Sequence, residues 1–309
     1  MEKVCFVLGV MPRSGTNFLA NVITLHPECV DSAPLHEDFL LSQSHWLQWF
    51  CRRTKRNWHP KWEKRNAKLA DDVLLAHIGQ GLTDFVCDLA SEQGDKTVIT
   101  KTPSSKQLRN FFRLFPERKL IIVIRDGRAL VESGVRSFDW DFEKACFDWH
   151  RSTQRIQRFV ECHQDKAEQI LLVKYEDLLA NTDIELARIY AFIGCDPSKV
   201  ASQQVREMDV IGSSEKRGQQ QDVDWKPVKR SASFDPAHRH SQWPSNKQRR
   251  FDWLAGKSLV EMGYQEEAKT FTLMERCYQR LADLTWGVRV LPRLIYHAVR
   301  YRKWIIKTS

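Results

Sequence analysis

Short apolar runs alternate with stretches of helical periodicity along the first two thirds of the chain. A short apolar run bounded by Gly, Pro or polar residues is typical of a buried strand, and an apolar residue at every third or fourth position is typical of an amphipathic helix. Buried strands that alternate with helices predict an α/β fold in which a parallel β-sheet is flanked by helices on both faces. The strand-like runs are residues 4–10, 29–33, 97–100, 120–124 and 170–173, and the clearest helical patterns are residues 17–25, 73–89 and 142–160.

The pattern changes in the last third of the chain. Between residues 211 and 244 the apolar periodicity disappears and Ser, Gln, Asp, Lys and Arg dominate, which predicts a long surface loop. Residues 284–306 mix Trp, Leu, Ile and Tyr with Arg and Lys at helical spacing, as in a basic amphipathic helix. We therefore expect one domain over residues 1–265 and a helical, basic C-terminal extension over residues 266–309. This extension is expected to pack on the body of the protein, and peripheral membrane contact is the alternative.

Composition adds a bias toward anionic partners. The 309 residues include 48 Lys and Arg against 39 Asp and Glu, a formal net charge of +9, which suits a nucleotide, a sulfated sugar, nucleic acid or a membrane face. The eight cysteines form no CxxC pair and no His/Cys cluster of metal-ligand spacing, so we expect reduced, mostly buried thiols. The first residues look too strand-like for a signal peptide, and no apolar run reaches the ~18 residues of a membrane span. These features predict a cytoplasmic protein.

The first candidate chemistry is in the loop after the first strand-like run, which reads Pro12-Arg13-Ser14-Gly15-Thr16-Asn17. A strand that leads through a Gly-containing loop into a helix gathers backbone N–H groups and the positive end of the helix around one point, which suits a phosphate. A Walker loop carries Lys directly after its second Gly, but here Thr16 follows Gly15, which argues against an ordinary ATPase or kinase. A plain structural turn is the alternative.

A second anion motif lies over residues 120–133. A buried strand delivers Arg125 at its C-terminal end, where open α/β sheets bind ligands, and Ser133 follows two helical turns later. Two hydrogen-bond donors can therefore converge on a second anion. A structural ion pair of Arg125 with Asp126 or Glu132 is an equal alternative.

Together, the two motifs resemble those of the sulfotransferases that use 3′-phosphoadenosine 5′-phosphosulfate (PAPS) as donor. That family has a strand, Pro-Lys/Arg-Ser-Gly-Thr and a helix, and later a strand, an Arg, and a Ser eight residues on. The resemblance spans residues 4–264, and the motifs are closer to the tyrosylprotein and carbohydrate branches than to the cytosolic phenol sulfotransferases. It continues through Lys101-Thr102-Pro103, Arg113-Leu114-Phe115-Pro116, Tyr175-Glu176-Asp177-Leu178 and residues 253–264.

The resemblance implies a P-loop-like sheet and roles for individual residues in binding the donor. The 3′-phosphate of PAPS would be held by Arg125 and Ser133, and Tyr175 would lie near the adenine. A late basic motif at Arg217 and Gly218 has two equal interpretations, as part of the donor site or as a solvated loop. No metal is required, and PAP is the product. The residues implied for the 5′-phosphosulfate are Arg13, Ser14, Gly15, Thr16 and Asn17.

Sulfuryl transfer also needs a base for the acceptor hydroxyl and cations for the charge that develops on the departing phosphate. Arg13 and Lys101 suit that charge. The family uses His in one branch and Glu in another, and this chain has His36 and Glu37 side by side. We favour Glu37 as the base, with His36 as the alternative and a structural role for both as the third possibility.

The acceptor is expected to be a hydroxyl of a carbohydrate, glycolipid or natural product rather than of protein tyrosine. Residues 45–62 concentrate aromatic and cationic side chains, and they read equally well as an acceptor wall or as a helix with Trp46, Trp49 and Phe50 in the core. One competing interpretation is a phosphoryl transferase with a degenerate loop, in which Asp126 would hold Mg²⁺. Another is a noncatalytic nucleic-acid or membrane-binding protein. It leaves the paired anion motifs unexplained, so we expect no nucleic-acid partner.

Overall fold

The computed structural model describes residues 3–66, 69, 71–90, 94–209, 211, 227, 229 and 235–308. The chain forms two compact units, Met1–Ser241 and Gln242–Ser309. The strands are β1 (Val4–Gly9), β2 (Cys29–Asp31), β3 (Thr97–Thr102), β4 (Lys119–Ile124) and β5 (Ile170–Lys174). The α-helices of the first unit are α1 (Thr16–Thr24), α2 (Ser44–Lys55), α3 (Pro60–Arg65), α4 (Asp71–Leu89), α5 (Phe111–Leu114), α6 (Gly127–Phe138), α7 (Phe142–Cys162), α8 (Tyr175–Ala180), α9 (Thr182–Ile193) and α10 (Ser202–Glu207). Short 3₁₀ helices are η1 (Leu41–Gln43), η3 (Leu108–Asn110), η4 (Gln164–Gln169) and η5 (Pro197–Lys199), and the second unit contains α11 (Ser245–Glu261) and α12 (Leu273–Thr308).

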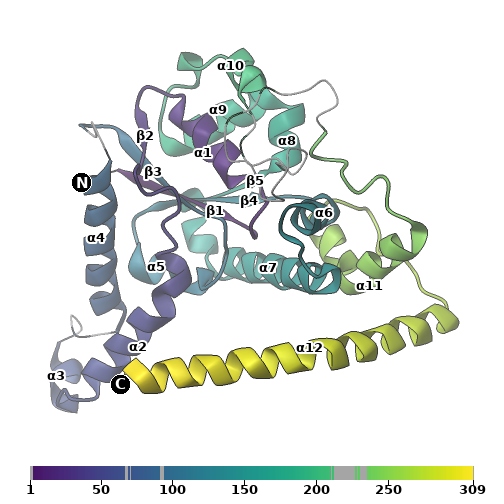
Figure 1. The fold of residues 1–309 in the computed structure, drawn as a ribbon. Coiled ribbons are helices and arrows are strands. Elements are labelled where there is room, and N and C mark those ends of the chain that lie inside the picture. The colour runs from purple at the N-terminus through teal and green to yellow at the C-terminus, as the bar shows by residue number, and fades with distance from the viewer. Residues whose placement is uncertain are drawn as a thin grey trace. The chain divides into compact units, whose positions relative to one another are not determined.

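The five strands form one sheet in the order β2-β3-β1-β4-β5, and every pairing is parallel (Figure 1). This confirms the α/β fold with a parallel sheet. β1 lies in the middle, with Leu8 opposite Thr102 of β3 and opposite Ile122 of β4. Because all strands run in the same direction, the segments that follow β1, β3 and β4 start from the same edge of the sheet.

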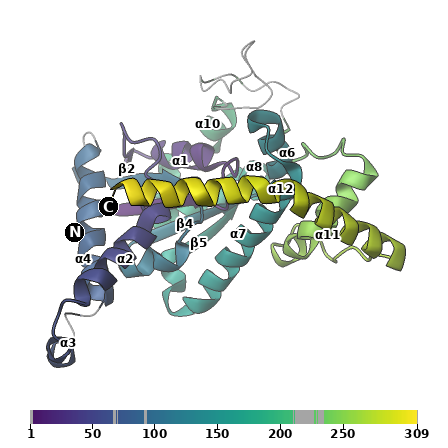
Figure 2. The same ribbon diagram turned by 60° about the horizontal axis from the view of Figure 1, so that its bottom comes forward.

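Helices cover both faces of the sheet, as the sequence predicted. α1 and α7 lie on opposite sides of it in both views (Figure 1, Figure 2). Successive side chains of a strand point to opposite faces, and β1 therefore contributes to two cores. Cys5 and Val7 pack in the core that contains α1 and α9, whereas Phe6 contacts the rings of Phe111 and Phe115. A strand that is buried on both faces fixes the position of the loop that follows it.

The second unit pairs α11 with the first turns of α12. Arg249 forms an ion pair with Glu275 at 2.5 Å, and the indole of Trp253 donates to Asp283 at 3.0 Å. The tail is helical, as its periodicity predicted. These contacts join the helices on either side of residues 265/266, and the division into a domain and an extension at that point stays a prediction. Of the helices that the structure describes, none combines the length and the apolar run that crossing a bilayer requires.

Candidate functional site

The loop between β1 and α1 has the conformation of an anion seat. Arg13 and Gly15 have positive φ angles of 75° and 98°, and Gly15 immediately precedes the first turn of α1. No side chain of the described residues caps this helix. The buried hydroxyl of Ser14 in the loop and the side-chain oxygen of Asn17 in the first turn of α1 find no hydrogen-bond partner among the described residues. Uncapped N–H groups beside unused polar side chains suit a phosphate or sulfate group.

Three guanidinium groups meet beside this loop. Arg13 donates from Nε to the fully buried hydroxyl of Ser133 at 3.1 Å, and Arg239 donates to the same hydroxyl at 3.4 Å. Arg125 donates from Nη1 to the backbone carbonyl of Arg13 at 2.7 Å. Burial, and then the charges of Arg125 and Arg239, lower the pKa of Arg13 to about 10. We call these four residues the guanidinium cluster; cations held this close repel one another, so the cluster favours an anion.

Backbone carbonyls hold Arg125 at the end of β4. Besides the carbonyl of Arg13, its guanidinium donates to the carbonyl of Pro236. Its buried Nε has no hydrogen-bond partner in the part of the chain that the structure describes. The alternative of an ion pair with Asp126 or Glu132 is wrong, because both carboxylates bind other arginines. Arg125 therefore keeps a donor for a ligand.

Tyr175 packs against the loop and against Arg125. The guanidinium carbon of Arg125 lies 4.8 Å from the centre of the Tyr175 ring. A Cβ atom at Gly15 would come within 2.4 Å of the same ring, and the φ angle there also favours glycine. Only glycine therefore allows the loop to lie this close to the ring. The contact of Tyr175 with adenine stays a prediction.

The predicted catalytic groups Lys101, Glu37 and His36 lie together at the end of β3. Lys101 Nζ donates to the backbone carbonyl of His36 at 2.5 Å and lies 3.9 Å from Glu37 Oε1. Burial lowers the pKa of Lys101, and the charge of Glu37 opposes this shift. The side chain of His36 is exposed, whereas Glu37 is partly buried. Since Lys101 pairs with Val7 of β1, this group lies at the same sheet edge as the loop.

The structure adds Asp38, which the sequence interpretation missed. Its carboxylate accepts hydrogen bonds from the hydroxyls of Thr102 at 2.6 Å and Thr100 at 2.7 Å, and from the N–H of Leu40 at 2.9 Å. Its own N–H donates to the carbonyl of Lys101 at 3.0 Å. Burial raises the pKa of Asp38, although these hydrogen bonds oppose the shift. Asp38 thus ties the segment that carries Glu37 to the end of β3. The sequence did contain a signal for this contact: Thr100 and Thr102 are polar residues at alternate positions of a buried strand, and their hydroxyls need a partner.

The late basic motif cannot be compared with the structure. Arg217 and Gly218 lie outside the described residues, and their role in donor binding stays a prediction. Arg239 joins the guanidinium cluster and was missed, because nothing in its local sequence distinguishes it from the surrounding polar loop.

The aromatic stretch after the candidate base forms α2 and α3. Of its large rings, Trp46, Trp49 and Phe50 are exposed by 39%, 60% and 52%. The alternative that these three side chains fill the core is therefore wrong. Their use as an acceptor wall stays a prediction.

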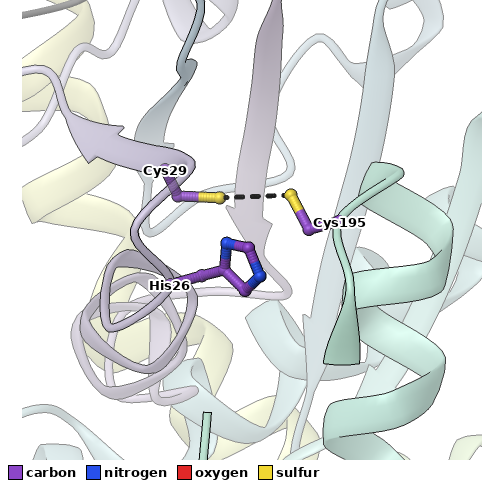
Figure 3. Close-up of side chains that lie close together, drawn as sticks. All are labelled: His26, Cys29 and Cys195. Carbon is purple, nitrogen blue, oxygen red and sulfur yellow. Dashed lines mark hydrogen bonds between the residues drawn. The ribbon is translucent and has the colours of Figure 1, made fainter. Parts of the chain in front are cut away.

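A His/Cys group beside the start of β2 was not identified in the sequence analysis. His26, Cys29 and Cys195 are buried, and their ligand atoms lie within 4.8 Å of one another (Figure 3). The N–H of Glu28 donates to Nδ1 of His26 at 3.1 Å, and Nε2 therefore donates to the carbonyl of Asp196 at 2.9 Å. Burial raises the pKa of both thiols, whose sulfurs are 3.8 Å apart. With both ring nitrogens bonded to the backbone and both thiols protonated, we assign the group to the core.

Comparisons with known proteins point to one family. The family model described as the sulfotransferase family matches residues 5–198, which include the loop, Lys101, Arg125, Ser133 and Tyr175. Protein-tyrosine sulfotransferase A of Caenorhabditis elegans is 25% identical over 235 residues, covering 72% of this chain and 58% of the relative. The protein-tyrosine sulfotransferase of Drosophila melanogaster is 22% identical over 205 residues, covering 62% and 38%. The chain spans less than two thirds of the length of either relative.

Solved structures that resemble the chain carry similar names. The sulfotransferase domain from the curacin biosynthetic pathway is 17% identical, with a TM-score of 0.43 and coverage of 92% of this chain and 98% of that domain. Mouse sulfotransferase SULT7A1, solved in complex with PAP, is 14% identical, with a TM-score of 0.44 and coverage of 92% and 89%. The family match confirms the resemblance that the two anion motifs indicated.

Proposed function

This chain belongs to the sulfotransferase family, and on that premise we propose that it moves a sulfuryl group from PAPS to a hydroxyl acceptor and releases PAP. The observation that carries the proposal is the guanidinium cluster beside the loop. PAPS has anionic groups at both its 3′ and 5′ positions, and the chain offers donors for two anions. The N-terminus of α1 suits the 5′-phosphosulfate, and Arg125, Arg239 and Ser133 suit the 3′-phosphate.

One finding changes the division of roles within this site. Arg13 was predicted for the 5′-phosphosulfate and Ser133 for the 3′-phosphate, yet their side chains are hydrogen bonded to each other at 3.1 Å. We propose that Arg13 lies between the two anions, where its backbone belongs to the loop and its guanidinium belongs to the cluster. One substitution at this position should therefore weaken both ends of the donor.

A phosphoryl transferase is less well supported. The loop lacks the Walker lysine. Asp126, the carboxylate that was considered for Mg²⁺, accepts from the backbone N–H of Arg128 at 2.8 Å and from its guanidinium at 2.5 Å. These bonds cap α6 and occupy both carboxylate oxygens, so Asp126 has a structural role that explains its position.

Bound PAPS supplies an activated sulfuryl group, and the chain supplies the groups that bring the acceptor to it. The oxygen of the acceptor hydroxyl forms a bond to sulfur while the bond from sulfur to the phosphate oxygen of the donor breaks. During this step Glu37 takes the proton of the acceptor hydroxyl. Lys101 and Arg13 stabilise the negative charge that develops on that phosphate oxygen. The contact of Lys101 with Glu37 at 3.9 Å supports placing the base and one of these cations in the same part of the site.

Two acceptor classes deserve direct comparison. The relatives are named for protein tyrosine, which makes a tyrosine peptide one arm of the test. The sequence expectation was a carbohydrate, glycolipid or natural-product hydroxyl, and an oligosaccharide and a glycolipid are the other arms. Transfer from labelled PAPS to each acceptor, with Glu37→Gln as the control, identifies the class.

Thermal unfolding tests the donor half without knowledge of the acceptor. We expect PAP to raise the unfolding temperature with EDTA present, because a ligand that binds only the folded state stabilises it. ATP with Mg²⁺ and duplex DNA should have much smaller effects. Ser133→Ala should reduce the PAP shift, since Arg13 and Arg239 lose a shared acceptor. Stabilisation by ATP and Mg²⁺ but not by PAP would favour the kinase, and stabilisation by DNA alone would favour a nucleic-acid-binding protein.

A further inference from the structure

A cavity of about 340 Å³ opens between η3 and α7 in the first unit. The residues that line it differ from those of the guanidinium cluster and from those around Lys101. Its wall is basic: Arg109 comes from η3, and Arg151, Arg155 and Arg158 come from α7. Spacings of four and three residues place the three α7 arginines on one face of that helix.

Three of the four arginines of this cavity form no ion pair with the described residues. Among the described residues, no carboxylate lies within ion-pair distance of Arg109, Arg151 or Arg158, all of which are exposed. Asp148, one turn before Arg151, forms its ion pair with a lysine of the same helix. Burial lowers the pKa of Arg155, the charge of Arg151 lowers it further, and the charge of Asp148 opposes this shift. Four guanidiniums around one cavity therefore create a positive potential that an anion would compensate.

The floor of the cavity is aromatic. Phe159 is buried and stacks on Phe112, with ring centres 5.5 Å apart and planes 13° from parallel. The ring of His163 lies 4.4 Å from that of Phe159. Aromatic faces pack well against the flat or apolar side of a sugar or another ring. The cavity thus combines an apolar floor with a cationic rim.

One arginine of the rim is fixed in place. Arg155 donates from Nη1 to the hydroxyl of Ser105 at 3.1 Å, and that hydroxyl donates to the carbonyl of Val10 at 3.0 Å. Val10 follows β1 and donates its own N–H to β4 at 2.9 Å. The central strands of the sheet therefore orient Arg155, and a side chain held in advance loses less conformational entropy on binding.

We propose that this cavity is a second anion-binding site, which takes a small ring-bearing molecule with two or more phosphate or sulfate groups. The volume is within the range of small-molecule sites. The exposed arginines bind the oxyanions, and Phe159 supports the ring. The site does not depend on the proposed sulfuryl transfer, because it shares no residue with the donor site.

Isothermal titration calorimetry of the full chain tests this site. The probes are glucose 1,6-bisphosphate, a trisulfated heparin disaccharide and, as the uncharged control, maltose. The double variant Arg151→Gln/Arg158→Gln removes two rim charges from exposed positions. The matched control, Lys199→Gln/Arg206→Gln, removes two charges from η5 and α10, and α10 lies on the opposite side of the sheet from α7 (Figure 1).

We expect at least one charged probe to bind the wild-type chain and the control variant, and maltose to bind neither. The rim variant should bind that probe about tenfold more weakly or worse, because two charge-assisted contacts are lost. Tighter binding of glucose 1,6-bisphosphate would identify phosphate as the group that the site prefers, and tighter binding of the heparin disaccharide would identify sulfate. Affinity that is the same in all three proteins, or no binding of either charged probe, would overturn the proposal. PAP titrated into the same three proteins should bind each with the same affinity. Loss of PAP binding would report a failure of the donor site, which this measurement distinguishes from a failure of the second site.

Discussion

The carboxylate of Asp38 should hold the segment that carries Glu37 against the end of β3, and Asp38→Ala tests this. The substitution removes the acceptor of two hydroxyl groups, those of Thr100 and Thr102. Both residues are fully buried, and their hydroxyls donate to Asp38 at 2.7 and 2.6 Å. A buried donor without an acceptor costs about 1–3 kcal/mol. Rotation of the Thr100 hydroxyl toward Ser32, 3.5 Å away, recovers part of this. We expect the free energy of unfolding to fall by about 2–4 kcal/mol.

Urea unfolding followed by tryptophan fluorescence measures this loss. The informative control is the double variant Asp38→Ala/Thr100→Val, because replacing both partners of a buried hydrogen bond by apolar groups is close to neutral. Thr102 is kept, since its hydroxyl also accepts the N–H of Phe39 at 3.0 Å. The double variant should be more stable than Asp38→Ala, because the buried Thr100 donor is no longer left without an acceptor. A wild-type midpoint for Asp38→Ala, or a double variant that is less stable than Asp38→Ala, would refute the reasoning.

The pH dependence of stability provides an independent check on Asp38. Burial raises the pKa of its carboxyl group. Between the ordinary pKa and this raised value, the folded protein binds more protons than the unfolded chain, so stability falls as the pH rises through that window. Asp38→Asn removes the titration. The stability of this variant relative to the wild type should therefore increase as the pH rises from about 4. A constant difference up to neutral pH would contradict the raised pKa.

Three further predictions concern the donor loop, its neighbours and the base. Arg125→Ala should weaken PAP binding by about tenfold or more and affect adenosine 5′-phosphosulfate much less, as measured by calorimetry; equal losses would remove Arg125 from the 3′-phosphate site. Gly15→Ala should lower the free energy of unfolding by about 1–3 kcal/mol, whereas Gly81→Ala on α4, whose added Cβ meets no described atom within 4 Å, should not. Glu37→Gln should reduce kcat by about 10² or more at nearly unchanged PAP affinity while His36→Asn remains active, and the reverse result would make His36 the base.

The central strands could be predicted because burial on both faces makes them continuous apolar runs. β1 and β4 read as such runs, and both are buried along nearly their whole length. β2 was harder to delimit. It is an edge strand that ends at Asp31, the last residue paired with β3, whereas the apolar pattern suggested an end at Ala33. The end of an edge strand depends on its neighbour, which local sequence does not reveal.

The same distinction separates the parts of the site that were predicted from those that were missed. Arg125 and Ser133 could be predicted because a strand end and a helical spacing are local features. Arg239 contacts Ser133 across 106 residues, and Asp38 contacts Thr100 across 62 residues. Neither partner is marked by its own neighbours in the sequence. Long-range packing assembles these contacts, and only the structure places them.

The hydrogen bonds of the guanidinium cluster explain why this site would favour a nucleotide with two anionic ends. The carbonyls of Arg13 and Pro236 orient Arg125, and the buried hydroxyl of Ser133 orients Arg13 and Arg239. Burial, and then the charges of Arg125 and Arg239, lower the pKa of Arg13 to about 10, because its charged form is removed from water and placed beside like charges. An anion that enters meets donors already in place and relieves that repulsion, so little binding energy is used for reorganisation. We therefore expect a ligand with a single phosphate to occupy either the cluster or the loop, and PAP to occupy both.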